Sequence, residues 1–421
     1  MKYKWLIPLL CGMIAEKFDV FLFDLDGVVY VGDEPLPAAV DSVTRLYEMD
    51  KELRFLTNDP RPTRRAVASD LREMGINAQE DEIVTSGWAT AQYLSQQDVT
   101  TTAVVGSEGL KTELQAAGIE ITDTDPEAMV VGANEETTYR DIRRATRHID
   151  RGAAFVGTNP DGSFPTPDGP APGAGAIVRA VEAAAGTEPT VVGKPEPLMF
   201  EMAIDGLSAN MSAVVIGDNP ATDVLGAHHA GHTGILVADE EPTAASARDR
   251  QEPELTISTL ADLFTEEIEP WESPPYSWPD QIRPGVAAVV TTDSDEVLLL
   301  KRADTEQWAL PTGSVERCEP VQEAISREVM EETGIRIQVE ELTGVYSQPE
   351  QQVFSYPSGK TVHFITNCFR CTIEAGTAEA DEEEALEVGF FGVNDLPSDI
   401  LPMQPQWIAD AIDMSGPCAI R

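Results

Sequence analysis

Residues Phe18-Asp-Val-Phe-Leu-Phe-Asp-Leu-Asp-Gly-Val-Val-Tyr30 lead from an apolar run directly into a pair of carboxylates. The run from Val20 to Phe23 is typical of a strand buried on both faces of a parallel sheet. Such sheets place their chemistry at the carboxyl ends of their strands, where Asp24 and Asp26 stand. One carboxylate there can attack a substrate while the other donates or accepts a proton. Because both carboxylates are negative, an anionic substrate needs a cation beside them. Gly27 lets the backbone turn away sharply, although an Asx-rich turn without chemistry remains an alternative for this stretch alone.

The chain has the length and composition of a multidomain globular protein. Its 421 residues are too many for one hydrophobic core, and 42% of them are hydrophobic, so two or three domains are expected. The net charge is -44, from 73 acidic and 29 basic residues. A surface that is this acidic and this poor in lysine suggests a halophilic protein in a salt-rich cytoplasm, where salt screens the repulsion between the acidic side chains. The same charge argues against nucleic acid as a partner, because nucleic-acid binding needs a basic face.

The N-terminal residues favour a cytoplasmic protein. Residues 1–12 resemble a weak secretory signal, but their apolar part is short and is broken by Pro8. The strand at Val20 follows within a few residues, and Met13 is an alternative start. No apolar run reaches the roughly 20 residues of a membrane-spanning helix, so no membrane association is expected.

Three further predicted strands end in polar residues that suit a phosphate. A hydroxyl at a strand end can hydrogen-bond a phosphoryl oxygen, and a lone lysine can offset phosphate charge. Two more carboxylates can complete a Mg²⁺ site, since Mg²⁺ favours hard oxygen ligands. Thr57 and Asn58 follow the expected strand 52–56, and Lys194 follows the expected strand 190–192. Asp218 and Asp223 follow the expected strand 213–216.

A second set of alternating strands and helices is expected between residues 84 and 189. Its strands are predicted at 103–105, 129–131 and 153–156, and its helices at 110–117, 139–149 and 174–185. Two turn-rich segments within it, Gly157-Thr-Asn-Pro-Asp-Gly and Pro170-Ala-Pro-Gly-Ala-Gly-Ala, are candidates for a rim that faces the substrate.

The motifs Asp-x-Asp, Thr-Asn, Gly-Lys-Pro and Gly-Asp-x-x-x-Thr-Asp, in this order, closely resemble the haloacid dehalogenase (HAD) superfamily. The insert resembles that of its C2-capped, NagD-like branch of nitrophenyl-phosphatase-type enzymes. Over residues 17–265 the resemblance implies an α/β protein with a Rossmann-like HAD core, residues 13–83 and 190–265, and an inserted α/β C2 cap, residues 84–189. The branch commonly has Asn where Asp59 stands, and this change adds negative charge near the substrate.

The resemblance also implies roles for individual residues. Asp24 would be the nucleophile that forms an aspartyl-phosphate, and Asp26 the general acid and base. Lys194 would be catalytic as well as phosphate-binding. The phosphoryl group would be held by Thr57, Asn58 and Lys194, and Mg²⁺ by Asp24, Asp218 and the backbone carbonyl of Asp26, with Asp223 in support.

Two clusters of possible transition-metal ligands are predicted to be structural. Cys368-Phe-Arg-Cys371 lies in an expected strand, residues 364–373, where positions i and i+3 point to opposite faces. His228-His229-Ala-Gly-His232 follows the fourth motif, but Gly231 is expected to end a helix there. The five cysteines form no disulfide framework.

Residues 266–283 form a linker rich in proline and acidic residues. Proline stiffens such a segment. The aromatic residues Trp271, Tyr276 and Trp278 predict that it docks on a domain instead of floating free.

A second catalytic domain is expected over residues 284–415. Its signature starts at Gly313, passes through Glu319 and ends in Arg327-Glu-Val-Met-Glu-Glu-Thr-Gly-Ile335. Pro320 and Gly334 would bound a helix there. The three glutamates would share one face of that helix, where like charges are destabilising without a cation. A solvated acidic face is the alternative.

Every fixed position of this signature matches the Nudix box, so this part resembles a Nudix hydrolase with an α/β/α fold. The resemblance implies Glu328, Glu331 and Glu332 as Mg²⁺ ligands, with Arg327 and Glu319 as orienting partners around Gly313. The acidic run at 381–387, which begins with Asp381-Glu-Glu-Glu384, is either a source of one further ligand or a surface run.

Together the two resemblances predict a bifunctional Mg²⁺-dependent hydrolase, for which Mn²⁺ also fits. One half would hydrolyse phosphate monoesters of small phosphorylated metabolites. The other half would cleave nucleoside diphosphate derivatives at the diphosphate. Two alternatives stay open: one domain acts as a sensing, regulatory module, or two unrelated activities are fused. The sequence does not indicate an oligomeric state.

Overall fold

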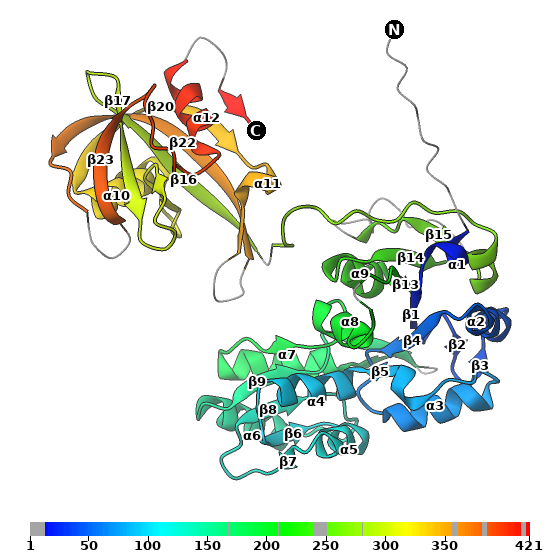
Figure 1. Cartoon of the computed structure of the whole chain (residues 1–421). Helices are drawn as coiled ribbons and strands as arrows, with labels where there is room; N and C mark the ends of the chain where they lie inside the picture. Colours follow the sequence, from blue (N-terminus) through cyan, green and yellow to red (C-terminus); the bar gives the residue numbers. More distant parts are fainter. Residues whose placement is uncertain are drawn as a thin grey trace, which may run out of the picture. The chain divides into compact units, whose positions relative to one another are not determined.

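The structure is a computed structural model that describes residues 13–166, 169–208, 210–238, 251–279, 281–355, 361–380, 385–413 and 418–421. Residues 1–12 and Asp381–Glu384, on which two expectations rest, lie outside this part. The chain divides into two units, one ending at Ser273 and the other beginning at Pro274 (Figure 1). None of the helices in the described ranges combines the length and the apolar character needed to span a membrane.

The apolar run of the first motif forms β1 (Val20–Asp24), an interior strand of a six-stranded parallel sheet. Its two neighbours, β13 (Ala213–Gly217) and β4 (Glu52–Thr57), pair with it in parallel. Because parallel strands end at the same edge, the polar residues at the ends of these strands are brought together. The remaining strands of the sheet are β5 (Ile83–Thr85), β14 (Thr233–Val237) and β15 (Leu255–Ile257).

Helices cover both faces of this sheet, as the apolar run predicted. The helices of this part are α1 (Ile14–Lys17), α2 (Ala39–Glu48), α3 (Arg64–Glu73), α4 (Ser86–Gln96), α8 (Pro197–Ile204) and α9 (Leu225–His229), and a short hairpin joins β2 (Tyr30–Val31) to β3 (Glu34–Pro35). Phe21 and Phe23 pack with α2 and α3 on one face. Val20 and Leu22 pack with α4, α8 and α9 on the other. All five residues of β1 are therefore buried.

The inserted elements form a second parallel sheet with the strand order β12-β9-β8-β6-β7. Its strands are β6 (Thr101–Val105), β7 (Glu120–Ile121), β8 (Ala128–Val131), β9 (Ala154–Gly157) and β12 (Thr190–Val191); its helices are α5 (Glu108–Ala116), α6 (Tyr139–Asp150) and α7 (Ala174–Ala185); an antiparallel hairpin joins β10 (Ser163–Thr166) to β11 (Gly169–Pro172). Both expected boundaries of the insert were wrong. Residues 84 and 85 lie in β5 of the first sheet, although the insert was expected to begin at residue 84. The strand expected at residues 190–192 forms, but it pairs with β9 of the inserted sheet and does not return to the first sheet.

The two faces of the inserted sheet have different neighbours. Val104 and Val130 belong to the same cluster of buried residues as Leu22 of β1, together with side chains of α4 and α5. Ala103 and Met129, which alternate with them, pack with α6 and α7. Helices α6 and α7 therefore cover the face of the inserted sheet that is opposite to the one facing the first sheet's core.

The second unit is built on a nine-stranded mixed sheet with the path β18-β17-β16-β22-β20-β24, to which β19, β21 and β23 attach at the side. The strands are β16 (Gln281–Thr291), β17 (Glu296–Arg302), β18 (Trp308–Ala309), β19 (Thr312–Ser314), β20 (Ile335–Tyr346), β21 (Val353–Ser355), β22 (Thr361–Gly376), β23 (Ala385–Gly392) and β24 (Ala419–Ile420); the helices are α10 (Val321–Thr333), α11 (Pro349–Gln352) and α12 (Gln404–Ile412).

Helices pack on both faces of this sheet, which gives the expected α/β/α arrangement. Helix α10 packs on one face with Cys371, and α12 packs on the other with Cys368. The two cysteines therefore point to opposite faces of β22, as their spacing predicted. Pro320 precedes the first residue of α10 and Gly334 ends the helix with φ +69°, so both expected helix boundaries are confirmed.

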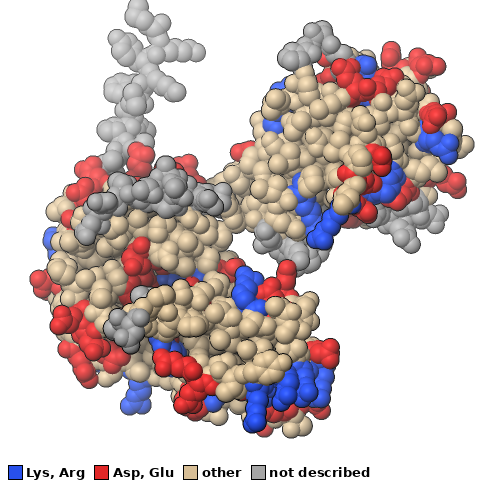
Figure 2. Space-filling view, turned by 180° about the vertical axis from the view of Figure 1, so that it is seen from behind, with Lys and Arg blue, Asp and Glu red and all other residues tan. Residues whose placement is uncertain are grey.

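The linker docks on the first unit where it leaves that unit. Ile268 is buried among the residues of the first core. The ring of Trp271 stacks on His228 at 4.5 Å between centroids, and its backbone N–H donates to Thr233 Oγ1 at 3.0 Å. These contacts confirm the predicted docking of the linker for Trp271. Acidic side chains are spread over the visible face of both units in Figure 2.

Candidate active sites

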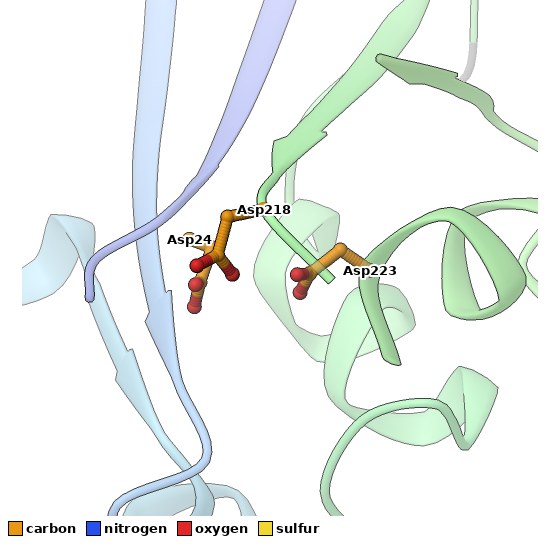
Figure 3. Close-up of side chains that lie close together, drawn as sticks. All are labelled: Asp24, Asp218 and Asp223. Carbon is orange, nitrogen blue, oxygen red and sulfur yellow. The ribbon is translucent and has the colours of Figure 1, made fainter. Parts of the chain in front are cut away.

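Three carboxylates meet at the carboxyl edge of the first sheet (Figure 3). Asp24 is the last residue of β1, Asp218 follows β13, and Asp223 lies on the helical turn Pro220–Val224. Each offers an oxygen atom, and these atoms all lie within 4.8 Å of one another. Gly27 and Gly217 make this approach possible, since a Cβ at either position would collide with Asp218 or Asp223. Gly27 also has φ +83°, the turn that its place after the carboxylates required.

A buried lysine holds two of these carboxylates. Lys194 follows β12 and is only 3% exposed. Its Nζ lies 2.5 Å from Asp24 Oδ1 and 2.6 Å from Asp223 Oδ1. Burial alone would lower the pKa of Lys194, but the two carboxylates raise it above its usual value. Lys194 therefore stays charged inside the protein.

Asp24, Asp218 and the neighbouring Asp26 are held more readily in their protonated form. Burial raises the pKa of Asp24 well above its usual range, while Lys194 acts against this rise. Partial desolvation and the charge of Asp223 raise the pKa of Asp218 to about 6. Partial desolvation and the nearby Asp59 raise the pKa of Asp26, which remains exposed to solvent. A cation would relieve this crowding of negative charge.

The end of β4 contributes polar groups from the neighbouring strand. Thr57 is buried, and its Oγ1 accepts the N–H of Asp59 at 3.1 Å. Both side-chain N–H groups of Asn58 are used, one by Asp161 Oδ2 at 3.0 Å and one by the carbonyl of Lys194 at 2.9 Å. Asn159 Nδ2 in turn donates to the carbonyl of Asn58. The segment 157–162, expected to form a rim, thus reaches the site through Asn159 and Asp161.

In the second unit, an arginine gathers the acidic residues of the signature. Arg327 donates two hydrogen bonds to Glu319, from Nε to Oε1 at 2.9 Å and from Nη2 to Oε2 at 3.0 Å. Its Nη1 lies 3.0 Å from both Glu328 Oε1 and Glu331 Oε2. The backbone of Gly313 passes so close to Glu328 that a Cβ there would collide with the carboxylate. The shared helix face predicted from the spacing is therefore present.

The three glutamates of this helix differ in their surroundings. Glu332 is 6% exposed and accepts the N–H of Thr312 at 3.2 Å, whereas Glu331 is exposed. Glu328 lies between these extremes. Within the part of the chain that the structure describes, these carboxylates do not converge as Asp24, Asp218 and Asp223 do. Arg327 is the cation that Glu328 and Glu331 contact.

Comparison with known proteins agrees with this geometry. A family model for haloacid dehalogenase-like hydrolases matches residues 21–120, a HAD-hydrolase-like model matches residues 191–263, and a NUDIX domain model matches residues 281–411. An acid sugar phosphatase of Staphylococcus epidermidis is 34% identical over 268 residues, which make up 63% of this chain and 96% of that protein. The chain belongs to the haloacid dehalogenase-like hydrolases. It is a hydrolase that joins a HAD phosphatase domain to a Nudix domain.

Similar solved structures assign the HAD part to the NagD-like branch of the superfamily. NagD of Escherichia coli K-12 is 28% identical, covers 58% of this chain and 97% of its own, and has a TM-score of 0.54. A glycerol phosphate phosphatase of Mycobacterium tuberculosis in complex with magnesium is 32% identical, with coverage of 60% and 78% and a TM-score of 0.55. The predicted NagD-like HAD fold, fused to a Nudix domain, is thereby confirmed.

The sequence did not reveal how the HAD domain balances the extra charge of Asp59. Arg61 forms a two-pronged ion pair with this carboxylate, Nε to Oδ1 at 2.8 Å and Nη2 to Oδ2 at 2.8 Å. The same guanidinium lies 4.6 Å from the ring centre of Phe164, which comes from the β10–β11 hairpin of the inserted domain. Two features of the sequence could have indicated this ion pair: Asp59 departs from the common Asn, and the basic residue Arg61 follows two positions later.

Proposed function

We propose that the HAD domain hydrolyses small phosphate monoesters through an aspartyl-phosphate on Asp24. The observation that carries this proposal is the contact of buried Lys194 with Asp24 Oδ1, at the edge where Asp218 and Asp223 also lie. Asp24 attacks the phosphorus of the ester, and the bond from phosphorus to the leaving oxygen breaks as Asp26 protonates that oxygen. Asp26 then takes a proton from water, whose oxygen attacks the phosphorus, and inorganic phosphate leaves Asp24.

The neighbouring groups hold the phosphoryl group in place for this exchange. The ammonium of Lys194 offsets the charge of its oxygens and keeps Asp24 oriented. The hydroxyl of Thr57 donates to one phosphoryl oxygen. Because both side-chain N–H groups of Asn58 are used, we assign its contribution to the backbone N–H.

The donor set of the HAD site fits a hard divalent cation. Three carboxylates with oxygens within 4.8 Å of one another suit Mg²⁺ or Mn²⁺. We propose Asp24, Asp218 and the backbone carbonyl of Asp26 as ligands, with Asp223 in support. When bound, the cation offsets the charge of the phosphoryl group. The magnesium complex of the Mycobacterium tuberculosis phosphatase supports this choice.

The leaving group of the ester would lie under the inserted domain, which we propose acts as the C2 cap. Asp59 and Arg61 present a carboxylate and a guanidinium there, beside the apolar ring of Phe164. This mixture suits a small leaving group with several hydroxyls. The similarity to an acid sugar phosphatase and to a glycerol phosphate phosphatase supports the same class of substrate.

The covalent step can be tested directly in the Asp26→Asn variant, which keeps Asp24 but lacks the general base that takes a proton from water. With glycerol phosphate and Mg²⁺, the mass of one phosphoryl group is expected on the peptide that contains Asp24. The further replacement Asp24→Asn should remove this label. A label on another residue, or full turnover without Asp24, would contradict the proposal.

For the second unit we propose cleavage of a nucleoside diphosphate linked to a further group. The glutamates of α10 would hold the cation, with Arg327 and Glu319 orienting them, and water would attack phosphorus. The acidic helix and its arginine support this assignment. A panel of nucleotide sugars and dinucleotides with Mg²⁺ at high salt should give a mononucleotide and a second phosphate ester. If every diphosphate in such a panel stays intact while the HAD domain is active, the proposal for the Nudix domain fails.

A further inference from the structure

A stripe of basic side chains follows α6 of the inserted domain and belongs to neither hydrolytic site. Its members recur at intervals of three and four residues, so they share one side of the helix. Together with Asp123 they line a groove of about 390 Å³. Basic side chains gather over the inserted domain, at the lower right of Figure 2. The members of this α6 stripe are Arg140, Arg143, Arg144, Arg147, His148 and Arg151.

The composition of the chain makes this stripe unusual. The chain has only 29 basic residues against 73 acidic ones, yet five of the basic residues fall within residues 140–151. All five are arginines. Arginine presents a planar fork of donors that binds a phosphate through two hydrogen bonds at once, whereas lysine offers a point charge.

Packing and helix stability account for only part of the stripe. Helix α6 packs on the sheet through Ala145 and Ile149, which are buried. The helix dipole favours cations in the last turn of a helix, which covers Arg147. It opposes cations in the first turns, where Arg140 and Arg143 stand. A ligand outside the helix is a better reason for their presence.

The carboxylates near the stripe are occupied by Arg144 and, for Asp123, also by His148, whose Nε2 lies 3.6 Å from Asp123 Oδ1. Arg144 Nη1 lies 2.5 Å from Asp123 Oδ1, and its Nη2 lies 3.7 Å from Asp141 Oδ1. Asp141 also accepts the backbone N–H and the hydroxyl of Thr138 at the start of the helix. Among the described residues, no carboxylate forms a salt bridge with the four exposed arginines of the stripe. Buried His148, which is 6% exposed, adds a polar group to the lining of the groove.

The size and surroundings of the groove restrict its ligand. The stripe runs about 16 Å along the helix, from a rise of about 1.5 Å per residue. A short ligand with charge on successive phosphoryl groups meets arginines on successive turns. A longer polyanion would extend beyond the stripe over a protein whose net charge is -44 and would be repelled.

We propose that the α6 stripe binds a small molecule that carries a diphosphate or a longer polyphosphate. The site is distinct from the HAD site, because α6 covers the face of the inserted sheet opposite to the one that joins the first core. Inorganic pyrophosphate and a nucleoside diphosphate share this chemistry, and the experiment separates them.

The test is calorimetric titration of the full chain with pyrophosphate, ADP and orthophosphate in EDTA, so that the metal-dependent sites do not contribute. The variant Arg143→Gln/Arg147→Gln removes two exposed members of the stripe. Its affinity for pyrophosphate is expected to fall at least about tenfold, since charge-assisted hydrogen bonds are lost. The matched control Arg65→Gln/Arg179→Gln removes the same charge from exposed positions on α3 and α7 and should bind as the unmodified chain does.

Each result decides a part of the proposal. If ADP binds more tightly than pyrophosphate, and this binding is lost in the stripe variant, the ligand is a nucleotide. If ADP and pyrophosphate bind equally tightly, the site recognises the diphosphate alone. Equal affinity in the stripe and control variants would overturn the proposal, provided that thermal melting shows both folded. It would also be overturned if orthophosphate bound as tightly as pyrophosphate, or if a single-stranded oligonucleotide bound more tightly.

Discussion

At the scale of single residues, the HAD site is a balance of buried charges, and one departure from the common pattern shows how the balance is kept. Asp59 adds a negative charge beside Asp26, whose pKa it raises. Arg61 compensates through two hydrogen bonds and also contacts Phe164 of the inserted domain. The sequence indicated the extra charge of Asp59. Its partner Arg61, two positions later, could be anticipated as well, whereas the contact of Arg61 with Phe164 could not, because that residue lies about 100 positions away.

Replacing Arg61 by Ala should impair the phosphatase, because the charge of Asp59 then faces an anionic substrate unbalanced. We expect kcat/KM for a small monoester to fall by about tenfold, as for the loss of a charge-assisted contact. The change Asp59→Asn in the same variant should restore much of the loss. Kinetics of the two single variants and the double variant measure this coupling, and purely additive effects would show that the ion pair does not act as a unit.

The pKa of Asp218 gives the metal response a pH dependence. This pKa lies at about 6 in the folded protein without metal, above its usual 3.8. At pH 5 a cation must therefore displace a proton, and at pH 7.5 it does not. Mg²⁺ should raise the melting temperature more at pH 7.5 than at pH 5, and Asp218→Asn should remove most of this difference. An equal effect of Mg²⁺ at both values would argue against Asp218 as a ligand.

At the scale of elements, the sequence predicted structure best where local pattern decides it. The apolar run of β1, the ends of α10 and the two faces of β22 all follow from neighbouring residues. The error at β12 has the opposite origin. Its apolar residues showed that a strand forms, but its partner β9 lies more than 30 residues away, and pairing at that distance leaves no local trace. The three histidines after the fourth motif were predicted to be structural, and His228 contacts Glu254 and Trp271.

Helix α10 allows its acidic face to be tested without unfolding the Nudix domain. Glu332→Gln keeps an oxygen that accepts the N–H of Thr312 but removes the charge. We expect diphosphate cleavage to fall by roughly tenfold or more and to need a higher Mg²⁺ concentration. Glu323→Gln, an exposed position on the same helix, serves as the control and should retain activity. If both variants cleave equally well, the glutamates form a solvated acidic face and not a metal site.

At the scale of the whole molecule, the net charge of -44 dominates. With 73 acidic residues and only 29 basic ones, repulsion should destabilise the folded state at low ionic strength, and salt should screen it. The melting temperature is expected to rise from dilute buffer to molar KCl. A flat profile over this range would remove the inference of a salt-rich cytoplasm.

The central claim is that one chain carries two separate hydrolytic sites. Two sets of motifs carry it, and they lie on different sheets in different units of the chain. The spacing of the motif residues predicted both candidate sites. In the structure Lys194 contacts Asp24 and Asp223, and Arg327 contacts Glu319, Glu328 and Glu331.

The most direct test crosses two variants with two activities. Asp24→Asn should abolish phosphate release from a monoester and leave diphosphate cleavage nearly intact, whereas Glu332→Gln should do the reverse. Both activities are measured on the full chain with Mg²⁺ at high salt, with free phosphate and nucleotide products scored separately. If either folded variant loses both activities, the two halves share one site or depend on each other, and the account of two independent sites is wrong.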